Sequence, residues 1–251
     1  MIRRILLAAV LALASGAALA QAPTNFSNGF NNLPSTHWMH GRSALPVPFP
    51  ERWAGWYDGF TTYTSGDWVL TTVEAGGGSA TEAITDADDG ILLITNDSNE
   101  DDGDFFQTVG ELFTFESGKE AYFEARFRIN DVTQTDYVIG LQVRDTTPLA
   151  VTDGVYFQSD DADALLDLHS MASSVDTAAT GVATLVDATY VTVAYYYDGA
   201  TSIIAAVDNV VVATITATPP TTELTVSFGM QNGEAVADTM SVDYVWFAKE
   251  R

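Results

Sequence analysis

The sequence predicts an all-β protein, built as a two-sheet antiparallel β-sandwich of jelly-roll type with an N-terminal extended arm. Three observations predict this class. Short segments in which apolar and polar residues alternate follow one another along most of the chain. Asp-Gly and Asn-Gly pairs, which tight hairpin turns favour, separate these segments. No segment keeps a helical period over about twelve residues, so no βαβ unit is expected.

The clearest strand covers residues 121–129, where the apolar side chains share one face and Tyr122, Glu124, Arg126 and Arg128 share the other. Asp208-Asn209, between two β-branched runs, is a strong hairpin signal. Further strands are expected at residues 67–73, 91–95, 137–144, 154–158, 164–170, 190–197, 202–207, 210–216, 223–229 and 240–247.

The chain is expected to divide into three parts. Residues 1–20 read as a signal-peptide-like leader, with a basic start, a short apolar run and Ala18-Leu19-Ala20 as the cleavage site. The mature protein would then have no membrane segment. Residues 21–55 hold five of the eight prolines and form the extended arm, and residues 56–251 form the β-sandwich domain.

The arm contains too many aromatic side chains for a free tail. We therefore expect it to pack on the domain or on a neighbouring subunit, as in a homo-oligomer. His37 and His40 lie in this arm, where a packing anchor is the preferred interpretation and a metal site the weaker one, since no third ligand is nearby.

Composition excludes several classes of function. Acidic residues outnumber basic ones by 34 to 10, and the net charge is −24. Nucleic acid is excluded as a partner because its phosphates must be met by Lys and Arg, and an anionic membrane is disfavoured for the same reason. The absence of cysteine excludes disulfides, thiolate metal sites and Cys nucleophiles. With His169 the chain has only three histidines, which leaves few candidates for a His-based triad.

Glycan hydrolysis requires two carboxylates about 5–10 Å apart, and the jelly-roll glucanases carry an E-x-D-x-x-E run on one strand. This chain has no such run. Glu124 is the only carboxylate in its strand, and Arg126 is expected to pair with it and keep it ionised. Asp243 stands alone in its segment. The sequence therefore predicts no catalytic residues and no enzyme activity, glycosidase activity included.

Acidic residues crowd two expected loops. Asp97, Asp101, Asp102 and Asp104 in the first are candidate calcium ligands, because calcium takes six to eight oxygens from such loops. A second group lies at residues 153–163. The order of residues typical of an EF-hand is missing, so a solvated acidic surface is the alternative. No other cofactor is expected.

Aromatic residues supply candidates for a glycan-binding surface. Tyr195, Tyr196 and Tyr197 are consecutive, so two of them point to one face of a strand and one to the other. A second group, near the start of the sandwich, contains Trp53, Trp56 and Tyr57. Packing in a core or an interface is the commoner role of such residues.

A series of short motifs resembles a family of tailed-phage proteins found in marine and environmental phages. The motifs lie at residues 27–32, 63–68, 92–97, 123–127, 140–147, 153–157, 196–199, 231–235, 240–244 and 249–251. The resemblance spans nearly the whole mature chain. It implies a concanavalin A/laminin G-like jelly roll and a non-enzymatic virion structural or capsid-associated role, with capsid or other virion proteins as partners.

The expected function is therefore that of a non-enzymatic phage virion surface protein, in particular a capsid decoration protein. The alternative is a concanavalin A-like carbohydrate-binding protein with a glycan as its partner. In that case the protein would be secreted or periplasmic after removal of residues 1–20.

Overall fold

The computed structural model describes residues 52–85 and 90–251. The leader, almost all of the expected arm, and His37 and His40 lie outside the described residues. The described part consists of strands, two short 3-10 helices and loops, and none of its helices has the length and apolar character needed to cross a membrane. The first strand, β1, begins at Trp53, inside the range expected for the arm.

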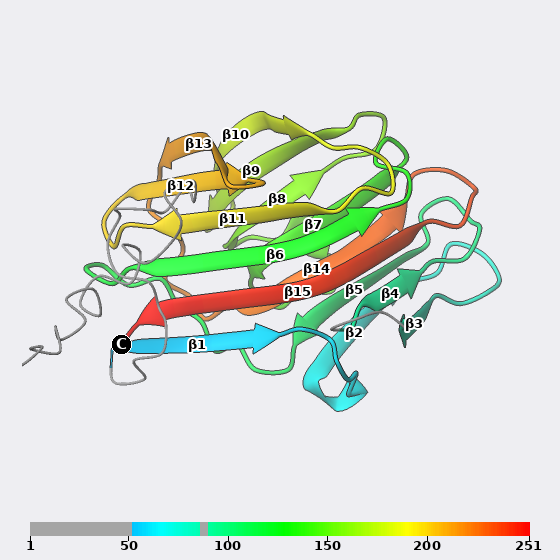
Figure 1. Ribbon diagram of the computed structural model, residues 1–251, viewed down its shortest axis with the longest axis horizontal. Coiled ribbons are helices and arrows are strands. Elements are labelled where there is room, and N and C mark those ends of the chain that lie inside the picture. Colours follow the sequence, from blue (N-terminus) through cyan, green and yellow to red (C-terminus); the bar gives the residue numbers. More distant parts are fainter. Residues whose placement is uncertain (1–51, 86–89) are drawn as a thin grey trace, which may run out of the picture.

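The strands form two antiparallel sheets that pack face to face (Figure 1). Sheet A has eight strands in the order β13-β12-β11-β6-β15-β4-β3, with β1 pairing the second half of β15. It comprises β1 (Trp53–Asp58), β3 (Thr81–Ile84), β4 (Leu92–Thr95), β6 (Ala121–Ile129), β11 (Val191–Tyr197), β12 (Ser202–Val207), β13 (Val210–Thr216) and β15 (Thr239–Glu250).

Sheet B has seven strands in the order β10-β9-β8-β7-β14-β5-β2. It comprises β2 (Trp68–Val73), β5 (Gly103–Thr108), β7 (Thr135–Gln142), β8 (Gly154–Ser159), β9 (Leu165–Ala172), β10 (Val175–Thr184) and β14 (Thr225–Asn232). The predicted all-β sandwich with two antiparallel sheets is thus confirmed.

The core lies between the sheets and follows from the two-residue alternation of the strands. In β6 the side chains of Phe123 and Phe127 are fully buried there, and Phe123 stacks on Tyr195 of β11 at 5.1 Å between ring centroids. From sheet B, Phe106 stacks on Phe228 at 5.3 Å. Aromatic side chains bury the largest apolar area per residue, which explains why a chain without disulfides holds two large sheets together.

Turn chemistry explains one of the two-residue hairpins. Asp208 and Asn209 connect β12 to β13 with φ angles of 47° and 65°. Two consecutive residues in the left-handed region are what a type I′ turn requires, and Asp and Asn tolerate that region better than most residues. The hairpin predicted at these two residues is confirmed.

The main departure from the predicted strands is β5, which occupies part of the expected acidic loop. All six of its residues are buried. Its side chains alternate between the core and the opposite face of sheet B, and that second face is itself covered by the loop between β7 and β8. A strand covered on both faces loses the alternation by which it could be recognised.

Candidate functional site

The outer face of sheet B, the side turned away from the core, carries a second apolar cluster. Phe105, Val138 and Tyr156 alternate with core residues of β5, β7 and β8, and all are nearly fully buried. Val151 from the β7–β8 loop completes the cluster, and Leu149 and Met171 pack against it. The loop therefore folds back over part of this face and leaves the β9 and β10 side of it accessible.

His169 and Asp176 lie on that accessible side. His169 of β9 lies opposite Tyr156 of β8 in the strand register, and the two rings stack at 5.3 Å with an interplanar angle of 17°. The Nδ1 atom of His169 is 2.8 Å from Oδ2 of Asp176 on β10. The His169 side chain keeps 18% of its surface exposed.

This geometry selects the tautomer of the neutral imidazole ring. A carboxylate only accepts hydrogen bonds, so Nδ1 carries the proton, and in the neutral ring Nε2 then presents its lone pair. The same relation between a carboxylate and an imidazole prepares the histidine of catalytic triads to act as a base. Burial, with the nearby charge of Asp176, raises the pKa of Tyr156 to about 12. The Tyr156 phenol therefore stays neutral at ordinary pH. It stacks on the His169 ring without competing for the imidazole proton.

A cleft borders the apolar cluster on the same face. It encloses about 320 Å³ and is lined by Val73, Phe105, Gln231 and loop residues 146–150. Phe105 and Leu149 belong both to this cleft and to the cluster that contains Tyr156. The cleft lies over β2, β5 and β14 and the His169–Asp176 pair over β9 and β10, so both are on the outer face of sheet B with the loop-covered cluster between them. The cleft volume is in the range of small-ligand sites.

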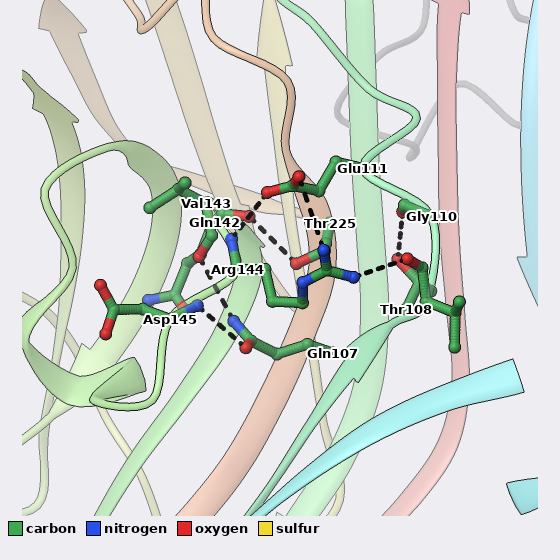
Figure 2. Close-up of polar contacts among 10 residues, drawn as sticks. Gln107, Thr108, Gly110, Glu111, Gln142, Val143, Arg144, Asp145 and Thr225 are labelled. Atoms are coloured by element: carbon green, nitrogen blue, oxygen red, sulfur yellow. Dashed lines mark hydrogen bonds and ion pairs between the residues drawn. The ribbon is translucent and has the colours of Figure 1, made fainter. Parts of the chain in front are cut away.

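Two buried glutamines hold the cleft wall in place (Figure 2). The side chain of Gln107 donates to the Val143 carbonyl at 3.3 Å and accepts from the Asp145 backbone N–H at 3.1 Å. Gln142 donates to the Pro148 carbonyl at 3.0 Å. Each amide thus replaces water as the partner of loop backbone groups that the fold buries.

Glu124 does not lie on this face but on the outer face of sheet A. The expected ion pair between Glu124 and Arg126 is absent, because Arg126 pairs instead with Asp243 of β15. Asp243 was expected to be isolated in its segment. It lies at a register shift of β15, between Val242 and Tyr244. Glu124 accepts a hydrogen bond from Tyr244 Oη at 2.6 Å and a further bond from the hydroxyl of Tyr122.

The four candidate calcium ligands are not brought together as one set. Asp97 and Asp102 both accept from the amide of Asn99, and Asp102 also accepts from the Ala75 backbone N–H. Asp101 is exposed at a positive φ. Asp104 lies in β5, buried and bonded to the Thr72 hydroxyl.

Across residues 52–85 and 90–251, no group of three or more His, Asp or Glu side chains is placed to hold a metal ion. Calcium binding at Asp97, Asp101, Asp102 and Asp104 stays a prediction.

The three consecutive tyrosines divide as their spacing requires. Tyr195 and Tyr197 point into the core, and Tyr196 packs on the outer face of sheet A with Tyr122 and Ala194. None is exposed, so this group offers no platform for a glycan. Sequence reasoning noted His169 but not its partner, because Asp176 reaches it only through the β9–β10 hairpin.

No model of a known protein family matches the chain, and no curated protein matches it in sequence. Its fold is similar to that of a protein of unknown function from Shewanella oneidensis MR-1, with a TM-score of 0.56, 15% identity, and coverage of 82% of this chain and 90% of that one. An endo-1,3-beta-glucanase from Streptomyces sioyaensis matches with a TM-score of 0.55 and 14% identity, over 82% and 99% of the two chains.

An endo-beta-1,4-glucuronan lyase from the fungus Trichoderma reesei matches with a TM-score of 0.51 and 13% identity, over 76% and 94% of the two chains. Two family 16 glycoside hydrolases from Bacteroides ovatus match similarly. At these identities the matches establish the fold, a concanavalin A-like jelly roll. The phage-family resemblance, and with it the virion partners and location, stays a prediction.

The same matches correct two expectations about function. The chain was expected to be a non-enzymatic virion surface protein, and to have no enzyme activity. Both expectations are contradicted, because the solved structures named above with a stated activity are carbohydrate-active enzymes. That expectation rested on a search for paired carboxylates within single strands, a test that does not detect groups brought together from two strands.

Proposed function

We propose that this protein is a carbohydrate-active enzyme that cleaves a polysaccharide containing uronic acid by β-elimination, with His169 as the proton-transfer group. The observation that carries the proposal is the 2.8 Å contact between His169 Nδ1 and Asp176 on the outer face of sheet B. The similarity in fold to a glucuronan lyase supports the reaction class.

One residue can act as both base and acid where C5–H and C4–O lie on the same side of the sugar ring, as they do in glucuronate. Nε2 of His169 takes the proton from C5 of the uronic acid, the C4–O bond to the leaving sugar breaks, and a C4–C5 double bond forms. The imidazolium then returns the proton to the leaving oxygen, so that the step needs no other reactant. Asp176 stabilises the imidazolium formed in between.

The substrate carboxylate needs a hydrogen-bond donor to make its C5 proton acidic. Gln158 of β8 lies two residues from Tyr156 on the same face, and its side-chain amide donates to Asp160 at 3.0 Å. An amide nitrogen has two hydrogens, so it can serve a second acceptor. The cleft on the same face of sheet B provides room for sugars further along the substrate.

Hydrolysis fits this face less well. Its strand carboxylates each have another partner: Asp136 accepts from the Asp161 N–H, Asp167 from the Gly181 N–H, and Asp176 faces His169. A glycosidase would need two carboxylates directed at one bond.

The test is the rate at which unsaturated sugar ends, which absorb in the ultraviolet, appear from polyglucuronate and from mannuronate-rich alginate, in which C5–H and C4–O lie on the same side of the ring. His169→Ala should lower the rate at least about 100-fold, as for loss of a general base. Asp176→Asn should also lower the rate. Asp167→Asn should not, although Asp167 lies on the same strand and face as His169. Wild-type protein without activity on any polyuronate, or full activity in His169→Ala, would overturn the proposal.

A further inference from the structure

A second aromatic surface lies on the opposite side of the sandwich, on the outer face of sheet A. Tyr57 of β1 is 65% exposed, and its ring stacks on Tyr244 of β15 at 6.2 Å with an interplanar angle of 29°. The stacked pair presents a flat aromatic ring at the surface, onto which an apolar ligand face can pack.

The Tyr244 ring, on which Tyr57 stacks, is fixed in position. Tyr244 donates its hydroxyl proton to Oε1 of Glu124 at 2.6 Å. Burial and the charge of Glu124 raise the pKa of Tyr244, so the phenol keeps the proton that it donates. Gly59 makes room for the upper ring, since a Cβ at this position would lie 2.6 Å from Tyr57 Oη. The two tyrosines therefore form a preorganised platform.

Beside the platform lies a hollow of about 470 Å³, lined by Tyr57, Asp58, Gly59, Thr61, Asp243 and Tyr244. Asp243 is held by its ion pair with Arg126. The hollow thus combines one exposed aromatic ring with two carboxylate groups and the Thr61 hydroxyl at its edge. Carboxylates accept strongly from hydroxyl groups, and a ring face packs on the C–H groups of a sugar.

We propose that this hollow binds one pyranose ring of a neutral glycan, stacked on Tyr57 with its hydroxyls donating to Asp58 and Asp243. The lining of the hollow favours a neutral sugar, because it adds the negative charge of Asp58 and no cation beyond the Arg126 that pairs with Asp243. The site lies on the other sheet from His169, so it serves for attachment and not for cleavage. It is independent of the proposed function.

The test is retention in gels that contain a neutral β-glucan, xylan or mannan, measured on His169→Ala protein so that turnover plays no part. Protein that keeps Tyr57 should be retained on at least one of these glycans. Tyr57→Ala should weaken binding at least about tenfold, as truncation of a central interface aromatic does. Tyr57→Trp should preserve binding, and Val210→Ala, at another exposed apolar residue, should leave it unchanged.

Gly59→Ala is a second probe, because it displaces the Tyr57 ring without removing it, and should weaken binding. Absence of retention on every neutral glycan, or equal retention of Tyr57→Ala and the parent, would overturn the proposal. Either result would leave the polyuronate assay unaffected, so the two proposals fail separately.

Discussion

Asp104 is a nearly fully buried carboxylate whose Oδ2 has no hydrogen-bond partner among the described residues. Burial, opposed by the Thr72 hydroxyl and assisted by Glu82 and Glu74, raises its pKa from 3.8 to about 6. The folded chain therefore binds this proton more tightly than the unfolded chain. The stability contributed by this group is complete below about pH 4 and is lost as the pH rises through about 6.

We predict that Asp104→Asn raises the melting temperature at pH 8, by an amount equivalent to about 2–3 kcal/mol, and has little effect near pH 4. The Thr72 hydroxyl can still donate to the amide oxygen. Thermal unfolding of both proteins across this pH range is the measurement. Parallel curves, or a less stable variant at pH 8, would contradict the burial argument.

Individual site residues were predictable only in part. Glu124 and the two arginines were placed correctly on one face, because alternation fixes the face of every residue in a strand. Their partners depend on which strand lies alongside, and the register shift beside Asp243 could not be seen in β6. His169 was noted as rare, but the turn at Ser173 and Ser174, both with positive φ, carries no Gly or Asn signal for the hairpin that brings Asp176 to it.

At the scale of elements, the β7–β8 loop depends on Gln107 and Gln142. We predict that Gln142→Ala destabilises the protein by about 1–3 kcal/mol, because the carbonyl of Pro148 and the hydroxyl of Ser227 lose a buried partner. Hydrogen exchange of the loop amides at residues 145–150 should accelerate more than exchange in β9. Uniform acceleration of exchange throughout sheet B would indicate a general loss of stability, and would contradict a local role of Gln142 in holding the loop.

The β7–β8 strand contact depends on Gly140, where a Cβ would lie 2.5 Å from the Cα and Cβ of Tyr156. We predict that Gly140→Ala costs about 2 kcal/mol or more, since backbone and not a flexible side chain blocks the new methyl group. It should also lower polyuronate cleavage by moving Tyr156 from beneath His169. Denaturant unfolding and the absorbance assay measure the two effects, and an unchanged value in both would contradict the close approach of β7 to β8 at this glycine.

For the whole molecule, the sandwich followed from short alternating segments and turn residues, which are local signals. The pairing order of the strands did not, because it is set by contacts far apart in the chain.

The net charge of −24 has a further consequence for a polyanionic substrate. We predict that kcat/KM on polyuronate rises with salt between about 0.01 and 0.3 M, as screening shortens the range of the repulsion. A rate that falls with salt would indicate a basic subsite.

The most direct measurement is mass spectrometry of the products formed from polyuronate in heavy-oxygen water. Elimination adds no water across the broken bond. The account predicts fragments whose new non-reducing ends are one water lighter than hydrolysis products and contain no solvent oxygen, and no such fragments from His169→Ala. Incorporation of heavy oxygen at the new reducing ends during cleavage, beyond slow exchange in a control oligosaccharide, would contradict it, as would the same products from His169→Ala.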